Sequence, residues 1–210
     1  MLGNEGLWAQ KIPPAFRCAR LKYSGGGDWY NDPSAVPNLM RYVKEKTGIA
    51  TPEKEETVEA SSPNIFQYRF VFMTGHGNVC FTEAELENLR AYLKSGGFIY
   101  VDDDYGMDKS FRREAKRLFS GTDLVELPYS HPTFNIFFNF PNGAPKTHEH
   151  DNQPPQTFGV FYDNRLVLLY TYESNPSDGW ANPEIHNDPP EKREEALQFG
   201  TNIVLYAITE

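Results

Sequence analysis

The sequence has no hydrophobic run that approaches the ~20 residues needed to cross a bilayer. It is also short of positive charge, with 20 Lys and Arg against 29 Asp and Glu and a net charge of −9. Proteins that bind nucleic acids gather Lys and Arg into patches, whereas the one basic cluster here, residues 112–117, is typical of the solvent-facing side of a helix. We therefore expect a soluble protein that neither spans a membrane nor binds nucleic acid.

Cysteine is scarce as well, since Cys18 and Cys80 are the only two. Two cysteines do not form a disulfide framework, and nothing in their spacing supports a bond between them, so their redox state is left open. No base with an orienting partner is visible around Cys80, so we expect it to be a small buried side chain. The GxSxG, GxGxxG and GxxxxGK[ST] motifs are absent too. The sequence therefore indicates no catalytic nucleophile and no cofactor.

What the sequence does contain is a central stretch, residues 69–106, with the pattern of a strand, a helix and a second strand. Residues 70–73 are a short apolar run closed by glycines, which fits a strand buried on both faces. Residues 82–97 have capping-box spacing at the start, leucines at helical spacing, and two glycines at the end. A second apolar run, residues 98–101, leads into the three aspartates of residues 102–104. This is a βαβ unit, which implies parallel strands.

The rest of the chain fits the same architecture, and we predict a three-layer α/β fold with a largely parallel sheet flanked by helices. Residues 1–15 are expected to be a flexible lead-in, and residues 16–210 a single α/β domain. The other expected elements are a strand over 16–23, a helix from about Ser34 to Gly48, short strands over 57–59 and 124–127, a helix capped by Asp108, a hairpin over 158–172 and a last helix over 191–208. The segments 141–156 and 173–190 are expected to be long loops, which in a compact domain are often functional.

The candidate site follows from the direction of the strands. Parallel strands end at one edge of the sheet, and open α/β sheets bind ligands at that carboxyl edge. We therefore expect the turn at His76 and the aspartate run to lie close together, with the glycine-rich loop that presents Asp28 and Trp29. The candidate ligand-binding residues are Asp28, Trp29, His76, Asn78, Asp102, Asp103, Asp104, His131 and Trp180. Trp29 and Tyr30, together with Trp180, would form an aromatic wall suited to a sugar or another flat ligand, although packing in the core explains such rings at least as well.

The aspartate run leaves two interpretations open. Because side chains alternate along a strand, Asp102 and Asp104 would point to one side and Asp103 to the other. Two carboxylates about 6 Å apart repel by roughly 2–3 kcal/mol at an effective dielectric constant near 20. The repulsion is relieved either by a cation or by hydrogen-bond donors and raised pKa values. We favour the second interpretation and expect no metal site.

A second group of possible metal ligands lies in the loop 141–156. His148, His150 and Asp151 resemble a ligand cluster in spacing. The loop has no visible rigid support in the sequence, however, so we interpret these residues as solvated.

Several segments together resemble a known family. They are ARLKYSGGGDWYNDP, MTGHGNVCFTEAELENLRAYLKSGGFIYVDDDYG, SFRREAKRLF, LPYSHPTF and GTNIVLYAIT. They resemble an uncharacterised bacterial family of domains of unknown function with a class I glutamine amidotransferase-like fold, distantly similar to the ThuA-like proteins linked to trehalose use. The resemblance covers about Phe16 to Thr209. In the amidotransferases a Cys follows the central strand, with a His-x-Glu downstream, whereas here Asp102 to Asp104 stand at that strand end.

The resemblance implies a domain without glutaminase chemistry. Members of the family are often encoded near MoxR-type ATPases and von Willebrand factor A proteins, which implies an envelope-associated protein assembly. Our leading hypothesis is a non-catalytic ligand-binding or assembly component with a small-molecule or protein partner, and whether it is an enzyme is left open. The alternative is a hydrolase, metal-assisted or not, acting on a carbohydrate-like substrate. The compartment is periplasmic if a signal has been removed near Ala9-Gln10, and cytoplasmic otherwise.

Overall fold

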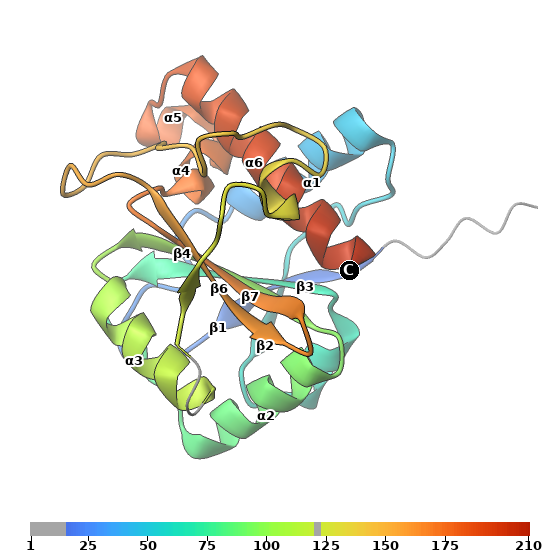
Figure 1. The fold of residues 1–210 in the computed structure, drawn as a ribbon, viewed down its shortest axis with the longest axis vertical. Helices are drawn as coiled ribbons and strands as arrows, with labels where there is room; N and C mark the ends of the chain where they lie inside the picture. The colour runs from blue at the N-terminus through green and yellow to red at the C-terminus, as the bar shows by residue number, and fades with distance from the viewer. Residues whose placement is uncertain (1–15, 120–122) are drawn as a thin grey trace, which may run out of the picture.

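A computed structural model describes residues 16–119 and 123–210, so the expected lead-in over residues 1–15 lies outside the described residues. The fold is α/β, with a seven-stranded sheet in the order β2-β1-β3-β4-β7-β6-β5 (Figure 1). The strands are β1 Cys18–Lys22, β2 Glu56–Glu59, β3 Phe70–His76, β4 Phe98–Tyr105, β5 Val125–Glu126, β6 Gln156–Tyr162 and β7 Arg165–Tyr172. Pairing is parallel from β2 through β7, and β6 is antiparallel to both β7 and β5. The largely parallel sheet predicted from the sequence is confirmed.

Helices cover both faces of the sheet, which makes a flavodoxin-like three-layer fold (Figure 1). The helices are α1 Ala35–Thr47, α2 Glu83–Lys94, α3 Asp108–Leu118, α4 Pro176–Trp180, α5 Pro183–His186 and α6 Pro190–Thr209, with 3₁₀ turns η1 Pro63–Gln67 and η2 Pro132–Phe134. Helices α2 and α3 lie on one face, and α1, α4 and α6 on the other. No helix among the described residues is long and apolar enough to cross a membrane.

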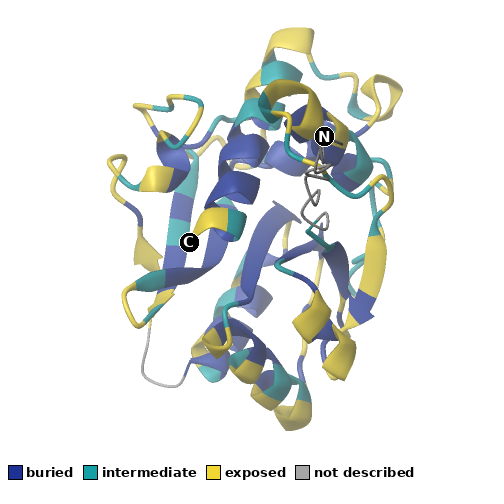
Figure 2. Cartoon of the chain, turned by 90° about the vertical axis from the view of Figure 1, so that its right-hand side faces the viewer, coloured by how far each residue is buried: buried dark blue, intermediate teal, exposed yellow. Residues whose placement is uncertain are grey.

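The two cores follow from the alternation of side chains along the central strands. Val71 and Met73 of β3 pack toward α2 and α3, whereas Phe70 and Phe72 pack toward α1 and α6. Because both faces are covered, these strands read as continuous apolar runs. Figure 2 shows the sheet buried along most of its length, with exposed residues on the outer sides of helices and loops.

Most local predictions are confirmed. The capping box at the start of α2 is present, with Thr82 accepting from the Glu85 backbone and the Glu85 carboxylate accepting from the Thr82 backbone. The hairpin of β6 and β7 turns at Asp163 and Asn164, whose φ values are 49° and 61°. Such left-handed values at both turn positions suit a tight hairpin, and Asp and Asn tolerate them better than most residues.

Three local predictions are wrong. The segment 173–190 is not one irregular loop, because it contains α4 and α5. Asp108 is the first residue of α3 rather than its cap, and the cap is Met107, whose backbone N–H is bound by the Asp103 carboxylate. Cys80 is exposed rather than buried, because it lies in the turn after β3, where an isolated bridge pairs it with Ser24.

Candidate functional site

The candidate site lies where four neighbouring parallel strands end. Strands β1, β3, β4 and β7 are consecutive in the sheet and point the same way. The segments that follow them are therefore brought to one edge. They are the glycine-rich loop after β1, the turn at His76, the aspartates at the end of β4, and the segment 173–188 after β7.

Arg20 holds the glycine-rich loop in place from inside the domain. Arg20 is only 2% exposed, and its guanidinium donates to the Glu55 carboxylate at 2.9 Å. The other guanidinium nitrogens donate to the backbone carbonyls of Trp29, Asn31 and Asp32. A planar group with five donors suits such a set of carbonyls. The loop that carries Asp28 and Asp32 is thus fixed by a buried charge.

Gly75 allows the loop to approach β3 closely. Its φ is +144°, and a Cβ atom added there would lie 2.2 Å from the Tyr23 hydroxyl and 3.1 Å from Asp28 Oδ1. Only glycine fits such a position. The close approach lets the Asp28 carboxylate accept the backbone N–H of His76 and lie 3.0 Å from His76 Nδ1.

His76 joins the glycine-rich loop to the aspartate run, as the direction of the strands predicts. Its Nδ1 atom is also 3.5 Å from Asp104 Oδ2. Burial raises the pKa of Asp28, but the hydrogen bonds from His76 outweigh it and lower that pKa overall. Asp28 therefore stays ionised beside the imidazole.

The first two aspartates of the run are satisfied by donors of the protein. Asp102 is fully buried and accepts from the Thr171 hydroxyl at 2.5 Å and from the Ser177 backbone N–H at 2.8 Å. Asp103 accepts from the Met107 N–H at 2.8 Å. Burial raises the pKa of Asp102 to about 7 and that of Asp103 to about 6, against the opposing effect of these hydrogen bonds.

Asp104 points instead toward a second group of acids. Its carboxylate accepts from the side-chain amides of Asn31 and Asn175, the latter at 2.8 Å. The Asn175 amide also donates to Asp178 Oδ2 at 2.8 Å. Carboxylate oxygens of Asp32, Asp104 and Asp178 all lie within 4.8 Å of one another. Burial and then the charges of Asp104, Asp102 and Asp32 raise the pKa of Asp178.

Two histidines close this group of acids. His148 Nδ1 lies 3.4 Å from Asp178 Oδ2, and His186 Nε2 lies 3.5 Å from Asp178 Oδ1. His186 Nε2 is also 2.9 Å from Asp32 Oδ2. His148, Asp178 and His186 each offer an atom within 4.8 Å of the other two, a spacing that suits a metal ion.

The loop that carries His148 is firmly supported, contrary to the expectation of a solvated loop. Lys146 pairs with the buried Glu173 carboxylate at 2.9 Å, and Glu173 also accepts the Asp151 backbone N–H at 3.2 Å. The Thr147 backbone N–H donates to the Ser174 carbonyl at 2.8 Å. These bonds attach the loop to the end of β7, so the position of His148 is fixed by tertiary contacts that the sequence pattern does not reveal.

A pocket of about 300 Å³ opens beside this group, between the ends of β4 and β7. Its carboxyl groups belong to Asp103, Asp108, Asp151 and Glu173, and its rings to Tyr105, Tyr172 and His150. The Tyr105 and His150 rings stack with centroids 4.8 Å apart. The His150 ring in turn stacks on His148, at 5.3 Å between centroids, so the pocket and the histidine-aspartate group are neighbours.

Three residues with left-handed backbone lie in the same region. Asp32, Glu173 and Asn175 have φ values of 46°, 56° and 49°. Left-handed backbone is uncommon outside glycine, although Asp and Asn adopt it more often than a residue such as Glu. Such conformations persist where the surrounding structure holds them, and they cluster at functional sites.

Four of the expected site residues lie elsewhere or have other roles. Trp180 is fully buried against Phe72 and Tyr100, so it forms no aromatic wall with Trp29. Trp29 is half-buried and packs against the core on the other face of the sheet. The His131 ring packs at a tilt against Tyr206, whose hydroxyl accepts from the Leu166 N–H at the start of β7, so His131 lies at the opposite edge of the sheet.

Asn78 supports the loop rather than facing the acids. Its side-chain amide donates to the Gly25 carbonyl at 3.0 Å, and its backbone carbonyl accepts the Gly27 N–H at 3.0 Å. Asn78 therefore belongs to the scaffold that positions Asp28.

Sequence reasoning missed the residues after β7. Asn175, Asp178 and His186 lie in the segment 173–190, for which the sequence predicts only a long loop, because it does not reveal that β7 lies beside β4. The dense polar run Ser174 to Asp178, directly after an apolar strand, is the one signal that could have identified them.

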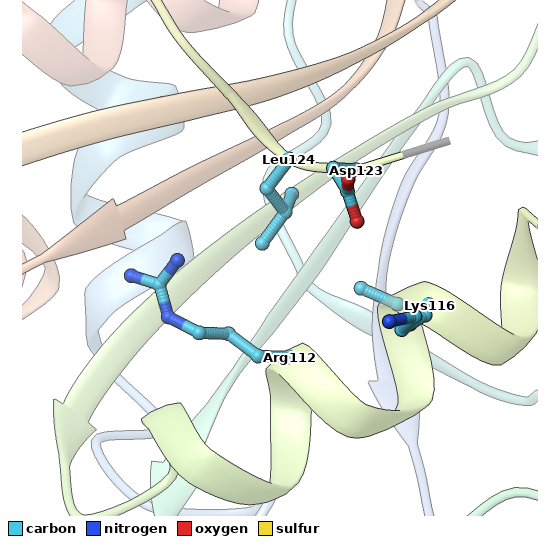
Figure 3. A pocket seen from close by; sticks show the side chains of 5 residues that line it. Arg112, Lys116, Asp123 and Leu124 are labelled. Atoms are coloured by element: carbon cyan, nitrogen blue, oxygen red, sulfur yellow. The ribbon is translucent and has the colours of Figure 1, made fainter. Parts of the chain in front are cut away.

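A second, smaller pocket lies along helix α3 (Figure 3). It has a volume of about 220 Å³ and is lined by Arg112, Ala115, Lys116, Asp123 and Leu124. Within the described residues, its lining shares no side chain with the groups at the carboxyl edge.

The fold and the site define a class: a flavodoxin-like three-layer α/β domain with a site rich in carboxylates and histidines at the carboxyl edge of its sheet. The chain belongs to the DUF4159 family, a domain of unknown function, whose match covers residues 17–208. Among curated proteins, none shows significant similarity to the chain.

Proposed function

We propose that this chain is a ligand-binding domain without glutaminase activity, and that its ligand occupies the pocket between the ends of β4 and β7. The observation that carries the proposal is the lining of that pocket, in which four carboxyl groups surround an open volume of about 300 Å³ flanked by aromatic rings. Ligand sites usually combine such rings with a few convergent polar groups.

The lining favours a ligand that donates hydrogen bonds. Carboxylates accept only when ionised, and Lys109 is the one cation among the described lining residues. Glu173 is paired with Lys146 and Asp108 with Arg112, but Asp103 and Asp151 have no cation partner among the described residues. These two carboxyl groups would disfavour a phosphate or carboxylate ligand, whereas a carbohydrate or an amine would supply donors. The exposed ring of Tyr105, stacked on His150, offers a flat surface to a sugar.

The two cysteines support the absence of glutaminase chemistry. Cys18 is buried in the core, and burial raises the pKa of its thiol to about 12. Cys80 is exposed, but its strand β3 ends in His76 and glycines, and the strand end expected to bear a nucleophile carries the aspartates. We include in the proposal that the chain is bacterial, that it is related to the glutamine amidotransferase-like domains, and that it is distantly related to the ThuA-like proteins.

Binding is tested with the purified full chain. Titration calorimetry against neutral disaccharides, trehalose included, and against spermidine is expected to show binding, and glucose 6-phosphate is expected to show none. Tyr105→Ala should weaken binding about tenfold, since an aromatic contact contributes roughly 0.5–1.5 kcal/mol. The matched control is Tyr129→Ala, another exposed tyrosine, which is 55% exposed and outside the pocket.

Two outcomes would contradict the proposal. One is tight binding of the sugar phosphate, with Tyr105→Ala and Tyr129→Ala behaving alike. The other is release of ammonia from glutamine that is lost on Cys80→Ala.

A metal-assisted hydrolase of a carbohydrate-like substrate is the second candidate. The specific observation in its favour is that His148, which faces Asp178, stacks on His150 of the pocket lining. Hydrolysis of nitrophenyl glycosides that depends on added divalent metal, and is lost on Asp178→Asn, would favour the enzyme over the binding domain.

A further inference from the structure

We propose that His148, Asp178 and His186 form a binding site for a divalent transition metal ion. The proposal goes beyond the ligand pocket and does not depend on what occupies it. The three residues come from different parts of the chain: the loop before β6, helix α4 and helix α5.

The spacing of the donor atoms fits one ion. Zn²⁺ binds histidine nitrogen and carboxylate oxygen at about 2.0–2.2 Å in tetrahedral sites, which places neighbouring donors about 3.3 Å apart. Here His148 Nδ1 is 3.4 Å from Asp178 Oδ2 and His186 Nε2 is 3.5 Å from Asp178 Oδ1, so each histidine faces its own oxygen. One donor atom from each of the three residues lies within 4.8 Å of the other two. In the absence of an ion, His186 Nε2 is hydrogen-bonded to Asp32 Oδ2 at 2.9 Å, and this contact would be exchanged for the metal.

Two of these donor atoms have no other role in the fold. Asp178 Oδ1 and His148 Nδ1 are buried and have no hydrogen-bond partner among the described residues. Asp178 is only 4% exposed. A buried carboxylate oxygen without a donor costs free energy, and a metal ion would satisfy it and His148 Nδ1 together.

The ligands are held in position before any ion binds. Asn175 donates to the Asp178 carboxylate at 2.8 Å, and this carboxylate lies on a helix that packs directly on α6. The Lys146–Glu173 ion pair and the Thr147 backbone bond fix the neighbours of His148 in sequence. Outer contacts of this kind orient metal ligands and contribute to affinity.

The donor set selects the kind of ion. Two imidazoles with carboxylates suit Zn²⁺ and the neighbouring transition metals, whereas Mg²⁺ and Ca²⁺ prefer oxygen ligands alone. The side chain of His148 is 43% exposed, so an ion can reach the site from solvent.

The test is metal binding by the full chain after treatment with EDTA and removal of the chelator. Equilibrium dialysis with elemental analysis should show about one Zn²⁺ or Co²⁺ per chain, with weaker binding of Mg²⁺ and Ca²⁺. Bound Zn²⁺ should raise the melting temperature by several degrees, because the ion binds the folded state. His148→Asn and His186→Asn should each weaken binding more than about 100-fold, since losing even an outer contact costs about 10–100-fold.

Asp178→Asn tests whether Asp178 is a metal ligand or only supports the fold. Asn keeps the size of the side chain and an acceptor oxygen for Asn175, so in EDTA the variant should melt within a few degrees of wild type, yet gain nothing from Zn²⁺. His131→Asn is the matched control, because His131 lies at the opposite edge of the sheet and Asn can replace it as the cap of η2. Its metal binding should equal that of wild type.

The proposal is overturned if wild type binds no Zn²⁺ or Co²⁺, if binding survives in the His148→Asn, His186→Asn double variant, or if His131→Asn loses it equally. Tight binding of Mg²⁺ or Ca²⁺ in preference to Zn²⁺ would also overturn it, since histidine ligation would then be wrong.

Discussion

Two groups of acids at the same sheet edge differ in how their charge is accommodated. Asp102 and Asp103 are buried at the end of β4, and each accepts hydrogen bonds from donors of the protein. Asp178 is equally buried, but one of its oxygens has no partner among the described residues, and two histidines face it. The carboxyl groups of Asp102 and Asp103 are therefore satisfied by hydrogen bonds within the fold, whereas Asp178 keeps an oxygen free to bind the metal ion proposed above.

The comparison shows that a run of aspartates in sequence is a weak indicator of a cation site. Consecutive residues of a strand point to opposite faces, so the three aspartates do not converge. The convergent acids, Asp32, Asp104 and Asp178, come from three different segments. What matters is which strand ends are neighbours in the sheet.

The largest effect is expected at Asp102, where the fold depends on the carboxylate as an acceptor. Asp102→Ala leaves the Thr171 hydroxyl and the Ser177 N–H without their partner in a fully buried place. Unpaired buried donors cost about 1–3 kcal/mol each, so we expect a loss of about 3 kcal/mol in the free energy of unfolding, measured by urea denaturation. Asp102→Asn keeps an acceptor and should lose much less. Equal losses in the two variants would show that the hydrogen bonds are not what matters.

A smaller effect, dependent on pH, is expected at Asp103. Its pKa of about 6 in the folded state exceeds the ordinary aspartate value of 3.8, so the folded state binds the extra proton between these two pH values. The contribution of Asp103 to stability therefore falls as pH rises from about 4 to 6 and stays low above it.

Asp103→Asn tests this sign, because Asn still accepts from Met107. The free energy of unfolding of the variant should increase relative to that of wild type as pH rises through that window. The difference should reach up to about 2–3 kcal/mol at pH 7, since one pKa unit corresponds to about 1.4 kcal/mol. Unfolding curves at pH 4, 5, 6 and 7 measure the difference. A difference that stays constant with pH would contradict the raised pKa.

The smallest effect, with the opposite sign, is expected at Asp28. Its pKa is lowered by His76, so its contribution to stability is present above the ordinary aspartate pKa and is lost as pH falls toward the lowered value. Asp28→Asn should therefore cost stability at pH 7 and little at pH 3. The pair is partly exposed, so the loss should stay below about 1 kcal/mol. If Asp28→Asn stabilised the protein at pH 7, the prediction would be wrong, and repulsion from neighbouring acids would outweigh the contact with His76.

The sequence by itself determined the βαβ unit of β3, α2 and β4. The apolar runs, the capping box and the glycines are local signals, and each acts through the conformation of its own segment. Since parallel strands end at one edge, these signals also placed His76 beside the aspartate run and the Asp28 loop, where the structure has it.

Only the tertiary structure decided which further segments reach that edge. The pairing of β7 with β4 joins apolar runs about 70 residues apart, and many alternative pairings would bury the same side chains equally well. That pairing brings Asp178 to Asp104 and carries Trp180 into the core. The position of His148 depends likewise on the buried pair of Lys146 and Glu173. Sequence pattern and composition indicate which side chains prefer burial. Contacts between distant segments decide which side chains become neighbours, and the candidate site consists of residues brought together in this way.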